Sequence, residues 1–118
     1  MTDTVIVGSG EYFIIFRVTD HVTGVDVDIS AAAVAVKYRF ENGETLDAPG
    51  TTQRTHPVTG ADLAVNEIAW VHPTDVASVF TAPGVYDFWL EIDGDANTLT
   101  KGITFAKRIS AVQPGSIG

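Results

Sequence analysis

The chain has 118 residues and a mass of 12.6 kDa, which is the size of one domain with a core of its own. It contains no cysteine, so disulfide bonds and thiolate metal sites are excluded. Its net charge of −8, from 15 acids and seven bases, argues against binding to nucleic acid and against adsorption to an anionic membrane.

The N-terminal residues, Met1-Thr2-Asp3-Thr4, have neither the basic nor the apolar segment of a secretory signal. No apolar run approaches the roughly 20 residues of a membrane-spanning helix. We therefore expect a protein that is made in the cytoplasm and is not exported by a cleaved leader. Residues 1–112 are expected to form one domain, and residues 113–118, Gln-Pro-Gly-Ser-Ile-Gly, a flexible tail.

Apolar and polar residues alternate with a period of two along much of the chain, which is typical of β-strands. Residues 4–7 predict a short first strand, and residues 12–19, which are apolar on both faces, predict a central strand. Residues 33–41 alternate most regularly and predict a strand with one solvated face, which Asn42-Gly43 ends with a strong hairpin signal.

The stretch from residue 42 to residue 64 is the longest expected connection and contains three glycines and two prolines. Within it, residues 51–56 predict a polar strand at the edge of a sheet. Long connections often carry function, although a mobile edge hairpin would have the same composition, and both interpretations stay open.

The second half of the chain predicts three further strands, at residues 66–71, 85–93 and 103–110. Alternation in the first of them directs Trp70 toward the core. Residues 73–80 predict one or two helical turns, because they begin with Pro-Thr-Asp. About seven short strands at roughly ten-residue spacing favour a β-sandwich, with a small barrel as the alternative.

Residues 93–97, Asp-Gly-Asp-Ala-Asn, match the start of an EF-hand calcium loop. The match fails at Thr98 and Thr104, where that motif requires Gly and Glu, so a polar hairpin loop explains the segment better. The three histidines lie far apart and predict surface or loop residues rather than metal ligands: His21, His56 and His72.

No motif for nucleophilic catalysis is present, since the chain lacks Gly-x-Ser-x-Gly and has no Ser, His and Asp in a family order. A pair of catalytic carboxylates remains open from the sequence, but the short loops of a small sandwich seldom build the cleft they need. We therefore expect no enzymatic activity, no cofactor and no bound metal.

Trp89 is the first candidate for partner binding, because it falls on the polar face of its strand between Asp87 and Glu91. An outward Trp serves as a hot spot for protein contact or as a platform on which a sugar ring stacks. The alternative is that both faces of the strand are covered and that Trp89 packs under a loop.

The charge is unevenly distributed along the chain. Residues 1–100 carry all 15 acids and four of the bases, which gives −11, whereas residues 101–118 carry three bases and no acid, which gives +3. We expect this basic segment of one copy to contact an acidic surface of another copy or of a partner, through Lys101, Lys107 and Arg108.

Four stretches of the chain follow a familiar order. Residues 25–38, Val-Asp-Val-Asp-Ile-Ser-Ala-Ala-Ala-Val-Ala-Val-Lys-Tyr, have the pattern of a turn and a strand. Residues 66–70, 74–76 and 82–91 then have the pattern of a strand, a threonine–aspartate helical turn and a glycine-x-tyrosine strand. Together, over residues 11–110, they resemble small immunoglobulin-like domains of tailed bacteriophages, such as the N-terminal domain of phage baseplate upper proteins.

This resemblance implies an all-β, immunoglobulin-like antiparallel sandwich of about seven strands with one short helical turn. It also implies a structural protein of the virion, in the tail, baseplate, neck or capsid decoration, made in the host cytoplasm. Its expected partners are other virion proteins and further copies of itself, with no nucleic acid, membrane or cofactor. The alternative function is a carbohydrate-binding module that recognises host-surface glycans through Trp89.

Overall fold

The computed structural model describes residues 3–10, 12–20, 22–41, 43–92, 103–104 and 107–113; of the tail expected at residues 113–118, all but the first residue lie outside this part. Strands and loops make up the described residues, which contain no helix. The ten strands are β1 (Asp3–Ile6), β2 (Phe13–Arg17), β3 (Thr19–Asp20), β4 (Val34–Phe40), β5 (Leu46–Asp47), β6 (Thr52–Gln53), β7 (Glu67–Val71), β8 (Gly84–Ile92), β9 (Ile103–Thr104) and β10 (Lys107–Val112).

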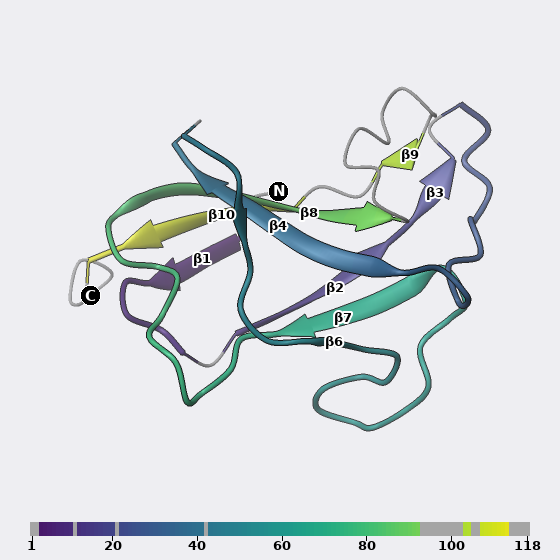
Figure 1. Ribbon diagram of the computed structural model, residues 1–118, viewed down its shortest axis with the longest axis horizontal. Helices are drawn as coiled ribbons and strands as arrows, with labels where there is room; N and C mark the ends of the chain where they lie inside the picture. The colour runs from purple at the N-terminus through teal and green to yellow at the C-terminus, as the bar shows by residue number, and fades with distance from the viewer. Residues whose placement is uncertain are drawn as a thin grey trace.

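The longer strands form two sheets. The first has five strands in the order β1-β10-β8-β4-β5, the second has three in the order β2-β7-β6, and β3 pairs separately with β9. Figure 1 shows β4, β8 and β10 in one layer and β2, β7 and β6 in the other. Paired strands are antiparallel except that β1 runs parallel to β10. The expected all-β sandwich is confirmed.

The strand order is that of an immunoglobulin-type sandwich, in which strands B, E and D oppose strands C, F and G. In chain order, β2, β6 and β7 occupy the places of B, D and E. The strands β4, β8 and β10 occupy the places of C, F and G, and β5 extends their sheet beside β4.

Aromatic rings fill the space between the two sheets. The ring centroids of Trp70 and Phe88 lie 5.3 Å apart, and those of Phe80 and Tyr86 lie 5.2 Å apart in an edge-to-face arrangement. Burying each such ring contributes roughly 2–3 kcal/mol. The predicted core position of Trp70 is confirmed, and its Nε1 donates a hydrogen bond to the carbonyl of Pro49 at 2.8 Å.

A tyrosine corner fixes the start of β8. The hydroxyl of Tyr86 donates to the carbonyl of Ala82 at 2.9 Å and accepts from the N–H of the same residue at 3.2 Å. Between them, Gly84 has a φ of 146°, and a Cβ there would lie 2.6 Å from the ring of Phe40. The sequence Ala-Pro-Gly-Val-Tyr therefore forms this corner because only glycine fits its middle position.

The prediction of a central strand at residues 12–19 is wrong. Within the described part of the chain, β2 pairs with β7 alone and forms an edge of the three-stranded sheet. Ile14 and Phe16 are buried, whereas Phe13 packs its exposed ring edge-to-face against His56 at a centroid distance of 5.7 Å. The apolar Phe13 on the outward side of β2 is therefore explained by its contact with His56, and β2 has no second flanking strand among the described residues.

The single last strand predicted at residues 103–110 is also wrong, because two strands occupy this stretch. The short β9 pairs with β3, whereas β10 pairs with both β8 and β1. The apolar face of this stretch is interrupted at Lys107, where β10 begins, but a single polar residue does not by itself reveal a change of partner.

Residues 73–80 contain a turn at Thr74 and Asp75 in place of the expected helical turns. His72, predicted at the surface or in a loop, is 1% exposed and lies 5.6 Å from the Trp70 ring. Its Nδ1 donates to the carbonyl of Pro73 at 2.8 Å, and its Nε2 accepts from the N–H of Val79 at 3.0 Å. The buried imidazole thus links the two ends of the loop at residues 73–79 by hydrogen bonds, in place of the hydrogen bonds of a helical turn.

Candidate binding face

The outward side of the five-stranded sheet takes its residues from simple alternation. On β8, Tyr86, Phe88 and Leu90 are buried, so the residues between them point away from the core. The neighbouring strands β1, β10, β4 and β5 are in register and add the residues that pair with these. We call this surface the outer face: Thr4, Ile6, Ala35, Lys37, Arg39, Asp47, Val85, Asp87, Trp89, Glu91, Arg108, Ser110 and Val112.

Trp89 lies near the middle of the outer face. Its strand, β8, is the third of the five, and Trp89 itself is half-buried. The register places Lys37 of β4 directly beside it. The Trp side chain is therefore neither wholly covered nor wholly exposed, so part of it is available for contact with a partner.

Asp87 binds two arginines across three strands. Its carboxylate accepts hydrogen bonds from Arg108 Nε at 2.9 Å and Nη2 at 3.4 Å, and Arg39 Nε lies 3.9 Å away. The Asp87 side chain is only 18% exposed. Its hydrogen bond and its charge raise the pKa of the Arg108 guanidinium. The cluster holds two cations around one partly buried carboxylate.

A second ion pair lies on the other side of Trp89. Lys37 Nζ donates to Asp47 Oδ1 across β4 and β5, and this hydrogen bond raises the pKa of Lys37. The Lys37 side chain is 21% exposed and that of Asp47 is 81% exposed. With Glu91, the outer face carries three bases and three acids, so its charges cancel although the chain as a whole carries −8.

A cleft of about 430 Å³ adjoins the outer face at Lys37. It lies between β4 and the chain that crosses from β5 to β6, and its walls include Thr51, Thr52 and Trp70. The Trp70 ring is 1% exposed, and its N–H is already bonded to a carbonyl. The cleft therefore offers no aromatic platform on which a sugar ring could stack.

Of the four predicted partner-binding residues, the three that the structure describes do not all lie on one face. Trp89 and Arg108 share the outer face, where Asp87 links their strands. Lys107 pairs in register with the buried Phe88 and so lies on the core side of β10, half-buried. Successive strand residues alternate between faces, so Lys107 and Arg108 cannot form one basic patch. Lys101 lies outside the described residues.

Three outer-face residues were not singled out from the sequence: Lys37, Arg39 and Asp47. Alternation along residues 33–41 places the two bases on the solvated side of their strand. Only the pairing of β4 with β8 and β5 shows that they flank Trp89 and meet carboxylates. Strand pairing is a long-range property that a single sequence does not reveal.

The described segments show no group of three or more His, Asp or Glu side chains able to hold a metal ion. His56 Nδ1 accepts hydrogen bonds from the N–H groups of Val58 and Thr59, which builds a turn. The residues 93–97 and His21 fall outside the described part of the chain. Of the segments that are described, none forms a helix that could cross a bilayer.

Away from the outer face, four acids lie in or next to the loops at residues 18–30 and 64–67. Asp20 Oδ1 accepts from the N–H groups of Val22 and Thr23, and Asp28 Oδ1 accepts from the N–H and hydroxyl of Ser30. These carboxylates shape turns next to the backbone that they bind. We call this region the acidic loop end: Asp20, Asp26, Asp28 and Glu67, with the loops at residues 18–30 and 64–67.

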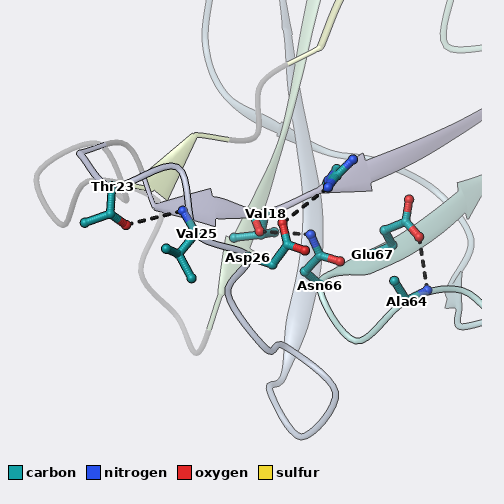
Figure 2. Close-up of polar contacts among 8 residues, drawn as sticks. Val18, Thr23, Val25, Asp26, Ala64, Asn66 and Glu67 are labelled. Atoms are coloured by element: carbon teal, nitrogen blue, oxygen red, sulfur yellow. Dashed lines mark hydrogen bonds and ion pairs between the residues drawn. The ribbon is translucent and has the colours of Figure 1, made fainter.

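Figure 2 shows how side chains close the acidic loop end. Glu67 Oε1 accepts from the N–H of Ala64 at 3.0 Å, and the Asn66 Nδ2 donates to the carbonyl of Val18 at 3.4 Å. Asn66 is 2% exposed, so this hydrogen bond lies inside the molecule. Asp26 forms an ion pair with Arg17, with Arg17 Nη2 3.3 Å from Asp26 Oδ1.

Comparison of the chain with family models, with curated proteins and with solved structures finds no match.

Proposed function

We propose that this chain is a structural protein of a tailed-phage virion, an immunoglobulin-like module that contacts neighbouring virion proteins through its outer face. The observation that carries the proposal is the half-buried Trp89 on the middle strand of the five-stranded sheet. It is flanked by two ion pairs, and each pair has no net charge. Trp and Arg dominate the binding energy of protein interfaces. Charges that already have partners cost less free energy to bury than charges without them.

The residue pattern supports the assignment to a phage particle. The stretches that resemble phage immunoglobulin-like domains coincide with β4, β7, β8 and the turns that precede them. These strands form the centre of the sandwich. The resemblance therefore concerns the scaffold that presents the outer face, which is the part that a docking module must keep rigid.

The test is incorporation into particles. Phage particles from a host that carries the gene are purified and analysed by mass spectrometry for the wild-type chain, Trp89→Ser, Arg108→Glu and the control Val58→Ser, which alters a residue 75% exposed in a loop outside the outer face. We expect the control to incorporate like the wild type and the Trp89 variant at least about tenfold less, as for loss of a hot spot.

Two outcomes would contradict the proposal. Absence of the wild-type chain from purified particles would remove the virion role. Equal incorporation of Trp89→Ser and the wild type would remove the outer face as the contact surface.

Comparing Lys107→Glu with Arg108→Glu, at low and high salt, separates the two sides of β10, since only Arg108 lies on the outer face.

The second candidate is binding to host-surface glycans, which Trp89 with the nearby carboxylates Asp87 and Glu91 favours, because aromatic rings and carboxylates together recognise sugars. Binding to a glycan array that is lost in Trp89→Ala would support it. No binding at millimolar sugar would count against it.

A further inference from the structure

We infer that two copies of this chain pair through their outer faces, sheet against sheet, around a two-fold axis near Trp89. This inference rests on the outer face being the contact surface of the proposed function, and it names a second copy as the occupant.

The distribution of charge selects this face. The outer face has three bases and three acids, whereas the other described residues have three bases and nine acids, a net charge of −6. Contact between two copies through the acid-rich parts of those other surfaces brings like charges together, which opposes association. The outward side of β2 and β7 also has no net charge, because Arg17 pairs with Glu67, but the outer face is built of five strands rather than three and has Trp89 near its centre.

Most charged side chains of the outer face are already paired with one another within a single chain. Arg108 and Asp87 form one pair, and Lys37 and Asp47 form another, on opposite sides of β8. A second copy therefore does not need to supply a matching ion for each of them. When two sheets stack about 10 Å apart, the central strands face each other, and Trp89 of each copy comes close to the axis.

The size of the face predicts a weak pair. The five strands comprise 28 residues, and at about 4.8 by 3.3 Å for each residue the face covers roughly 440 Å². Two such faces bury on the order of 900 Å² in total, which is in the range of transient interfaces. Such a contact becomes strong only where many copies are held together, as in a ring or lattice.

The first experiment measures the mass of the purified chain by sedimentation equilibrium from about 10 μM to about 1 mM, the range in which weak pairs form. We expect the wild type and Val58→Ser to shift from monomer toward dimer, and Trp89→Ser to stay monomeric. A wild type that is monomeric throughout would overturn the pairing, even if the chain is incorporated into particles. If the chain dimerises but is absent from purified particles, the proposed virion role is overturned and the pairing of outer faces is kept.

The second experiment exchanges charges between two variants. Lys37→Glu changes the charge of the outer face from zero to −2, and Asp47→Lys changes it to +2. Each variant alone is expected to self-associate at least about tenfold more weakly than the wild type, because identical faces then repel. An equimolar mixture is expected to form a heterodimer at least as well as the wild type dimerises.

Thermal unfolding of each variant confirms that it is folded before its mass is measured. Should Trp89→Ser not fold, the charge pair decides the question, since Lys37 and Asp47 both point away from the core, on β4 and on the edge strand β5. A wild type that dimerises while the mixed variants do not would place the contact elsewhere on the surface and overturn the inference.

Discussion

The outer face and the acidic loop end are both rich in carboxylates, but the two regions use them in opposite ways. At the acidic loop end, Asp20, Asp28 and Glu67 each bind backbone N–H groups two or three residues away. On the outer face, Asp87 and Asp47 bind cationic side chains that neighbouring strands supply. The loop acids therefore determine local chain geometry, and the sheet acids determine the electrostatics of a surface.

This difference predicts a separation of effects. Changes at the acidic loop end should lower the free energy of unfolding and leave contact with partners intact. Changes on the outer face should alter contact with partners and leave the free energy of unfolding nearly unchanged.

The largest loss of stability is expected from Asn66→Ala. It removes the buried hydrogen bond to the carbonyl of Val18 and leaves that group with one partner fewer, which costs about 1–3 kcal/mol. Urea unfolding measures the loss, with Val65→Ala, at an exposed neighbouring position, as the control. An unchanged unfolding midpoint would show that the buried amide does not close this end.

A smaller loss, about 1 kcal/mol, is expected from Asp20→Ala, because the N–H groups of Val22 and Thr23 lose their acceptor. Asp20→Asn keeps an acceptor oxygen and should recover more than half of the loss. Both variants should retain the wild-type tendency to dimerise. If the two variants unfold at the same midpoint, the charge of Asp20, and not its role in the turn, is what matters.

On the outer face, Asp87→Ala should cost less than about 1 kcal/mol of stability, because its partners are largely exposed. The same change leaves Arg39 and Arg108 without their shared anion and changes the charge of the outer face from zero to +1. Self-association should fall severalfold, as measured by sedimentation. A loss of stability larger than that of Asn66→Ala would reverse the comparison between the two regions.

The smallest effect concerns pH. Hydrogen bonds from the hydroxyl and the N–H of Ser30 lower the pKa of Asp28 in the folded chain. A carboxyl whose pKa is lower in the folded state adds stability above its unfolded pKa, near 3.9, and loses it as the pH falls through the folded value. NMR titration of the Asp28 carboxyl should show this pKa rising in Ser30→Ala, and an identical titration curve in both proteins would contradict the assignment.

The sequence predicts the local parts of this structure well. The strands β4, β7 and β8, the core position of Trp70 and the turn before Tyr86 follow from alternation and from turn residues that are neighbours in the chain. His72 shows where such reasoning ends, because a histidine before proline is typical of an exposed turn. Its burial depends on Trp70 and on the N–H of Val79, which folding brings to it.

The candidate site was predictable only in part, because it too combines residues that are distant in the sequence. Alternation placed Trp89 on the outward side of its strand, and the structure agrees. Lys107 and Arg108 were grouped by their adjacency in the chain, although adjacent strand residues face opposite ways. Which residues of other strands flank Trp89 depends on pairing between segments about 50 residues apart, and no local pattern encodes it.

The parallel pairing of β1 with β10 has a consequence for biosynthesis. The first strand finds its only described neighbour more than 100 residues later, so the five-stranded sheet stays open on the ribosome until residue 112 has emerged. Contacts this distant in sequence also make folding slow. In the nascent chain, the edge of β8 that binds β10 therefore stays unpaired until this late strand has been synthesised.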